Sequence, residues 1–112
     1  MAKVSEINFQ IHLDDQHVPD KIMWTAADKA TPGYEEAKAI SLALWDHNQQ
    51  STLKIDLWAK DMPVLDMKRF YLESIGGIAE SLKNATGDTN MVNAINELCE
   101  KLGKYLEQQS KM

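Results

Sequence analysis

The side chains of this sequence that could carry out chemistry gather mainly in one polar stretch. His12, Asp14, Asp15 and His17 follow one another closely, and imidazole and carboxylate groups are common ligands of divalent metals. Their spacing fits no metal-binding motif, and the sequence offers no second group to complete a shell of ligands. We therefore interpret the stretch as the solvated end of a hairpin, and we expect neither a metal nor a cofactor.

The other reactive side chains are explained by local structure. Asp56, Lys60 and Asp61 are close in sequence, but ordinary strand and helix-cap residues account for all three. The dipeptide Asp46-His47 falls at the end of a second expected hairpin. Cys99 stands inside an apolar helical pattern, where a lone cysteine is usually a small core residue. Because the sequence contains no G-x-S-x-G, P-loop or H-E-x-x-H motif, we expect that the chain is not an enzyme.

The composition is that of a small acidic globular protein. The 112 residues suit one domain, and 44% of them are hydrophobic and 26% charged. The net charge of −5 argues against nucleic acid, which needs a basic face, and against adsorption to anionic lipid. The sequence has no run of about 18 apolar residues and no signal-peptide pattern. We therefore expect a cytoplasmic protein that does not insert into membranes.

Two segments near the start alternate apolar and polar residues, as half-buried strands do. They span residues 4–13 and 20–27, with a polar connection between them. In the second segment Trp24 falls on the apolar face and Met23 on the polar face. Pro19 cannot donate to a strand ladder, so it belongs at the start of the second strand. These features predict an antiparallel hairpin.

Residues 34–46 are compatible with a helix or with a strand, and the following segment favours the strand. Residues 51–59 alternate clearly, and a strand over residues 38–47 would pair with them as a second hairpin. Such a register leaves Asn48-Gln49 as a two-residue turn, in which Asn tolerates positive φ. The register that aligns the apolar residues pairs Leu44 with Leu53, Leu42 with Ile55, and Ile40 with Leu57.

Before Trp58 every second residue is apolar, whereas after it apolar residues recur every three or four positions. This change predicts two helices. The first spans about residues 62–85, with Asp61 as its N-cap, and the second spans about residues 89–108. Gly76-Gly77 lies inside the first helix and indicates close packing or a kink. The complete order predicts an α+β fold, a single domain over residues 1–112. In that fold a four-stranded antiparallel sheet of two hairpins carries both helices on one face.

The whole pattern resembles the gliding-motility-associated GldC family of Bacteroidetes-type bacteria. The resemblance runs from about Ser5 to the second helix and weakens toward the C-terminus. It implies a small cytoplasmic accessory protein that assists gliding motility, in machinery linked to a dedicated secretion system. Another protein component of that machinery is the partner that we expect. The resemblance carries no known catalytic residues over to this chain. The segments that carry it are SEINFQIHLDDQHVPDKIMWTAAD, EEAKAISLALWD and LKIDLWAKDMPVLDMKRFY.

Strand parity places a candidate partner-binding surface on the sheet face away from the helices. If the leucines and isoleucines of the second hairpin face inward, Trp45 and Trp58 point outward, and Met23 joins them from the first hairpin. Tryptophan is enriched at binding hot spots. These three residues are therefore our predicted site for another protein.

Two further hypotheses follow from apolar residues elsewhere. A pocket between sheet and helices, lined by Trp24, Met67 and Tyr71, would make the chain a small-ligand-binding domain. The last helix carries a stripe that is wide for the end of a small domain, which predicts a homodimer. The stripe consists of Met91, Ile95, Leu98, Leu102 and Tyr105.

Overall fold

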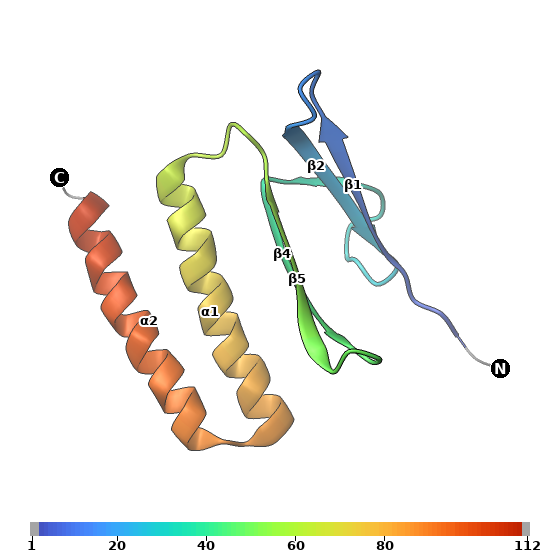
Figure 1. Cartoon of the computed structure of the whole chain (residues 1–112). Helices are drawn as coiled ribbons and strands as arrows, with labels where there is room; N and C mark the ends of the chain where they lie inside the picture. The colour runs from blue at the N-terminus through green and yellow to red at the C-terminus, as the bar shows by residue number, and fades with distance from the viewer. Residues whose placement is uncertain (1–2, 111–112) are drawn as a thin grey trace. The chain divides into compact units, whose positions relative to one another are not determined.

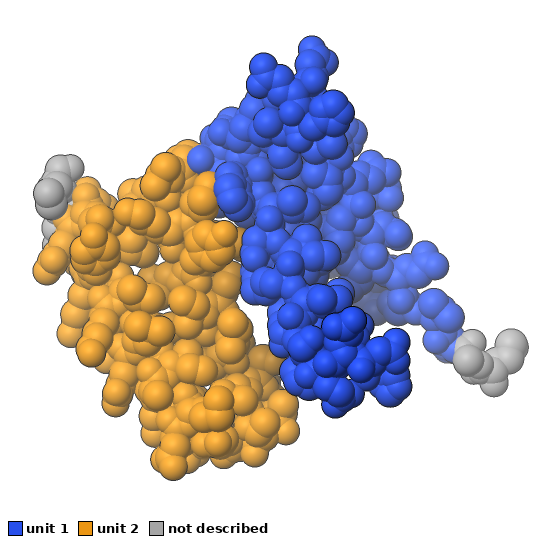
Figure 2. All heavy atoms as spheres, in the orientation of Figure 1, with its two compact units in different colours: residues 1–62 blue, residues 63–112 orange. Residues whose placement is uncertain are grey.

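The computed structural model describes residues 3–110, in which five strands precede two helices (Figure 1). This order confirms the predicted α+β class. The chain divides into two compact units, residues 1–62 and residues 63–112 (Figure 2). The elements are β1 (Ile7–Leu13), β2 (Pro19–Ala26), β3 (Glu35–Ala37), β4 (Ala39–Asp46), β5 (Ser51–Trp58), α1 (Val64–Thr86) and α2 (Thr89–Ser110).

The β1–β2 hairpin is the one that the alternation predicts. Phe9 pairs with Trp24 on one face, and Gln10 pairs with Met23 on the other. The connecting turn contains His17 in the left-handed region at φ 63°. Asp14 organises this turn, because its carboxylate accepts the backbone N–H groups of Gln16 at 2.8 Å and Val18 at 3.0 Å. Asp14 therefore stabilises the hairpin end in which the sequence places it.

The β4–β5 hairpin confirms the predicted register in full, with Leu44 opposite Leu53, Leu42 opposite Ile55 and Ile40 opposite Leu57. The predicted two-residue turn at Asn48-Gln49 is wrong. Asp46 and Ser51 are the last pair, so residues 47–50 form the loop, and the positive φ of 51° falls on Gln50. The Asp46 carboxylate accepts the Gln49 N–H at 2.6 Å, and this bond favours the longer loop.

The predicted single four-stranded sheet is corrected to two sheets. β1, β2 and β3 form one sheet, and β4 and β5 form the other. The two sheets separate at Lys38, which lies between β3 and β4. Its carbonyl oxygen accepts the Ala59 N–H at 2.8 Å. The short β3 pairs with β2 through Ile22–Ala37. A bend of this kind lets one run of chain leave one sheet and enter another.

The predicted N-cap at Asp61 is also wrong. α1 begins at Val64 after Pro63, which occupies the cap position without a side-chain hydrogen bond. Asp61 instead accepts hydrogen bonds from the ammonium of Lys38 at 3.2 and 3.3 Å. The Asp61 carboxylate therefore pairs with Lys38 in the first unit rather than with the helix. The helix begins at Val64, later than the change in apolar spacing after Trp58 indicates.

The two helices form an antiparallel hairpin around a short connection (Figure 1). Gly87 ends α1 at φ 69°, and its N–H donates to the Lys83 carbonyl oxygen at 2.9 Å. Asp88 then caps α2, because its carboxylate accepts the Met91 N–H at 3.1 Å. That both helices pack on one face of a sheet, in one domain, stays a prediction.

Gly76 and Gly77 lie in continuous helix, with no heavy atom within 4 Å of where a Cβ would stand. The close packing that the sequence indicated at this point is therefore not present among the described residues. Glycine in a helix interior costs roughly 0.5–1 kcal/mol relative to alanine.

We therefore expect Gly77→Ala to raise the free energy of unfolding by about 0.5–1 kcal/mol, because it restricts the unfolded chain and meets no neighbour. Urea denaturation measures the change. Gly87→Ala is the matched control and should lower the same free energy by about 1–2 kcal/mol, since alanine is strained at positive φ. Destabilisation by both substitutions would contradict the open space at Gly77.

Candidate functional site

The register of β4 and β5 divides the hairpin into an apolar face and a mixed face. Ile40, Leu42, Leu44 and their partners in β5 share the apolar face. The opposite face, which we call the tryptophan face, has an indole near each end and polar residues between them. Its cross-strand pairs are Ala39–Trp58, Ser41–Asp56, Ala43–Lys54 and Trp45–Thr52.

Both indoles of the tryptophan face are open to solvent. Trp45 is 67% exposed and Trp58 is 46% exposed. Trp58 is six residues beyond Thr52, the partner of Trp45. At a rise of about 3.3 Å per residue the two rings therefore stand roughly 20 Å apart. The face carries two separate anchors rather than one aromatic patch.

A closed polar network occupies the middle of the tryptophan face. The Lys54 ammonium donates to the Asp56 carboxylate at 2.6 Å and to the Ser41 hydroxyl at 2.5 Å, and Ser41 donates to Asp56 at 2.7 Å. The Lys54 ammonium and then the Ser41 hydroxyl lower the pKa of Asp56. Because these charges satisfy one another, the space between the tryptophans is polar without an unpaired charge.

The third predicted site residue, Met23, belongs to the other sheet. It lies in the middle strand β2 and shares a face with Gln10 of β1 and Glu36 of β3. Its side chain is half-buried. The structure thus places Trp45 and Trp58 on one strand pair and Met23 on a different one, because the chain bends at Lys38.

The residues of the alternative ligand pocket fall in different units. Trp24 is half-buried in β2, and the ammonium of Lys29 lies 4.9 Å from the centre of its ring. Lys29 also contacts Glu35 at 2.6 Å, and its side chain is 5% exposed. Met67 and Tyr71 lie on α1 in the second unit. Nothing in the sequence predicts these contacts of Lys29, because they join a loop to Trp24 of β2 and to Glu35 of β3.

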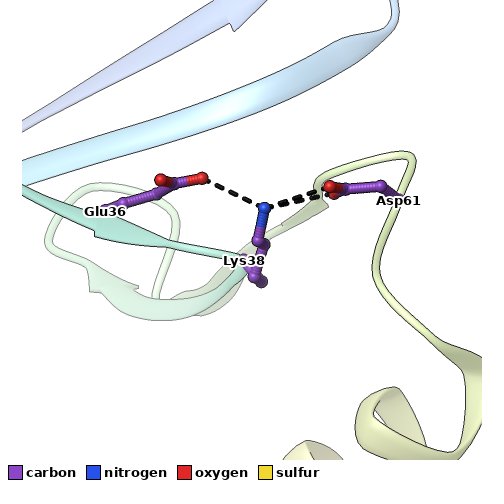
Figure 3. Close-up of polar contacts among 3 residues, drawn as sticks. All are labelled: Glu36, Lys38 and Asp61. Atoms are coloured by element: carbon purple, nitrogen blue, oxygen red, sulfur yellow. Dashed lines mark hydrogen bonds and ion pairs between the residues drawn. The ribbon is translucent and has the colours of Figure 1, made fainter.

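Lys38 is the centre of a second polar group that sequence reasoning missed. Its ammonium lies between the carboxylates of Glu36, at 3.0 Å, and Asp61, at 3.2 Å (Figure 3). Hydrogen bonds to Glu36 and then to Asp61 raise the pKa of Lys38. The alternation along β3 and β4 gives no hint of this contact, because its partners come from both sides of the bend.

The stretch that could have bound a metal is held by an ion pair instead. The Lys60 ammonium donates to Asp14 at 2.8 Å, and this bond and the Val18 N–H lower the pKa of Asp14 to about 2. Among the described residues, no group of three or more His, Cys, Asp or Glu side chains is arranged to hold a metal. Lys60 therefore fastens the residues that follow β5 to the β1–β2 turn.

Comparison with protein families identifies a relationship for most of the chain. A family described as "Gliding motility-associated protein GldC-like" matches residues 19–108. No curated protein matches this chain, and no solved structure does. Neither helix within residues 3–110 has the length and apolar content needed to cross a membrane.

The Asp14 ion pair predicts acid sensitivity. Because the folded pKa of about 2 lies below the ordinary 3.8, the ionised carboxylate stabilises the fold above about pH 4, and this stabilisation is lost as the pH falls toward 2. We expect Asp14→Asn to lower the urea midpoint at pH 6 and to flatten its decline between pH 5 and pH 2. Lys60→Met should flatten it similarly, whereas an unchanged slope in both variants would contradict the assignment.

Proposed function

The chain belongs to the GldC-like family of gliding motility-associated proteins, and we propose that it acts as a small accessory protein that binds another protein component of that machinery. The tryptophan face of β4 and β5 is the proposed site. The observation that carries this proposal is the exposure of two indoles at the ends of one strand face.

The chemistry of the tryptophan face favours a protein partner. Tryptophan is among the side chains that contribute most to protein interfaces, and truncation of an anchor typically costs about 2 kcal/mol or more. The Lys54–Asp56–Ser41 network between the anchors is already paired. A partner can therefore cover it without leaving a buried charge unsatisfied.

The separation of the anchors indicates the kind of partner surface that fits. With the rings roughly 20 Å apart, a partner must supply two apolar recesses joined by a polar strip. A span of that length is within a standard interface of about 800 Å² per partner. A small ligand could reach only one of the rings.

We place the protein in the cytoplasm, where it works without catalysis of its own. The Lys54–Asp56 and Lys60–Asp14 groups each have a structural explanation, which favours a binding role over an enzymatic one. The apolar stripe of α2 supports a second interaction, with another copy of the chain. The accessory role, the location and the self-association are parts of the same proposal.

We expect Trp45→Ser combined with Trp58→Ser to abolish partner capture and to leave folding nearly intact, because both rings are exposed. Affinity capture from cells of the species that encodes the chain, followed by mass spectrometry, measures the loss. Each single substitution should weaken binding about 30-fold, which corresponds to about 2 kcal/mol. Tyr34→Ser is the matched control, since Tyr34 lies in a loop and is 46% exposed, as Trp58 is.

Strand parity supplies a second, positional readout. A photo-reactive amino acid at Ala43 lies on the tryptophan face, whereas one at Leu44 lies on the opposite face of the same strand. The captured protein should cross-link from position 43 and not from position 44. Unfolding of the double variant, or equal cross-linking from both positions, would refute the proposed site.

A further inference from the structure

The second unit presents a continuous apolar face that its own two helices leave open. Apolar side chains recur every three or four residues along the whole of α1 and of α2, as on one side of a helix. Six of them are between 39% and 68% exposed. These six are Val64, Tyr71, Ile78, Met91, Leu98 and Tyr105.

The contact between α1 and α2 uses a different side of each helix. Small residues such as Ala79 and Val92 are buried, and both border the groove where the helices meet. The exposed stripe stands roughly a quarter turn away from them, because residues advance about 100° along a helix. Packing of the two helices against each other therefore cannot cover the stripe.

A shallow hollow of about 230 Å³ lies between the helices on this apolar face. Tyr71 and Ile75 of α1 and Leu102 and Tyr105 of α2 line it. Lys68 also reaches its edge, where its ammonium donates to the Gln109 side chain at 3.1 Å. The hollow thus offers room for apolar side chains, and the ammonium of Lys68 at its edge already has a hydrogen-bond partner in Gln109.

Charge separates the two sides of the helical hairpin. The acidic residues of α1 and α2 all fall outside the apolar stripe, at positions 66, 73, 80, 97, 100 and 107. Two identical stripes can therefore meet without like-charge repulsion, in spite of the chain's net charge of −5. A basic partner would gain no charge complement on the stripe, and Lys68 at the edge of the hollow already donates to Gln109.

We infer that a second copy of the chain covers this face, so that two helical hairpins form a four-helix bundle about a twofold axis. This inference rests on the proposed self-association and specifies its surface. The six side chains are about half exposed and present on the order of 500 Å² of apolar area, if each offers about 150 Å² when free, the low end of the aromatic range. Half-buried neighbours such as Met67 and Leu82 add to this area, and a stable complex buries roughly 800 Å² per partner.

Sedimentation of the full chain, from about 1 µM to about 1 mM, tests the inference. The wild type should sediment with twice the monomer mass of 12.7 kDa. Leu98→Glu places a charge at the centre of the stripe and should raise the dissociation constant at least about 100-fold. Asn93→Glu adds the same charge to the polar side of α2 and should leave the dimer intact.

A monomeric wild type, or equal weakening by Leu98→Glu and Asn93→Glu, overturns the inference. If Leu98→Glu does not fold by circular dichroism, Leu98→Ala takes its place and should weaken the dimer about 10-fold. A different protein bound at this face of a monomeric chain also overturns it. The Leu98→Glu variant should still cross-link to the captured protein from a photo-reactive amino acid at position 43, and the double tryptophan variant should stay dimeric. The proposed tryptophan site and the proposed dimer can therefore fail independently.

Discussion

The cross-strand register of β4 and β5 is the constraint on which the rest of the first unit depends. Side chains alternate between the faces of a strand, so a slip of one residue would exchange the apolar face for the tryptophan face. Leu44 opposite Leu53 and Ile40 opposite Leu57 fix this choice. Once those pairs form, Trp45 and Trp58 must share the other face, where they lie near opposite ends.

The bend at Lys38 is the second feature that shapes the first unit. It sends β3 to the sheet of β2 and β4 to the sheet of β5. The ammonium of Lys38 then meets Glu36 before the bend and Asp61 after β5. Lys60 makes a comparable contact with Asp14. Exposed pairs of this kind contribute little individually, about 0–1 kcal/mol, but the Lys38–Asp61 and Lys60–Asp14 pairs join segments that are distant in sequence.

The second unit reflects a different physical problem. Two antiparallel helices can bury only one side of each against the other, and a wider apolar stripe is then left over. In this chain the contact side of α1 buries Ala79, and side chains of the leftover stripe, such as Tyr105, are more than half exposed. The leftover stripe is the surface on which we propose self-association, and the acidic residues lie on the other sides of both helices.

The sequence by itself determined the features that depend on local periodicity. Alternation with period two located β1, β2, β4, β5 and the β4–β5 register, and apolar residues spaced by three and four located both helices, because these signals come from neighbouring residues. The short strand β3 was not predicted. The division into two sheets, the place of Met23 apart from the tryptophans and the partner of Asp61 were decided only in the tertiary structure. Each depends on a contact between distant segments. A carboxylate such as Asp61 can cap a helix or pair with a lysine, and only the folded chain brings Lys38 close enough for the second choice.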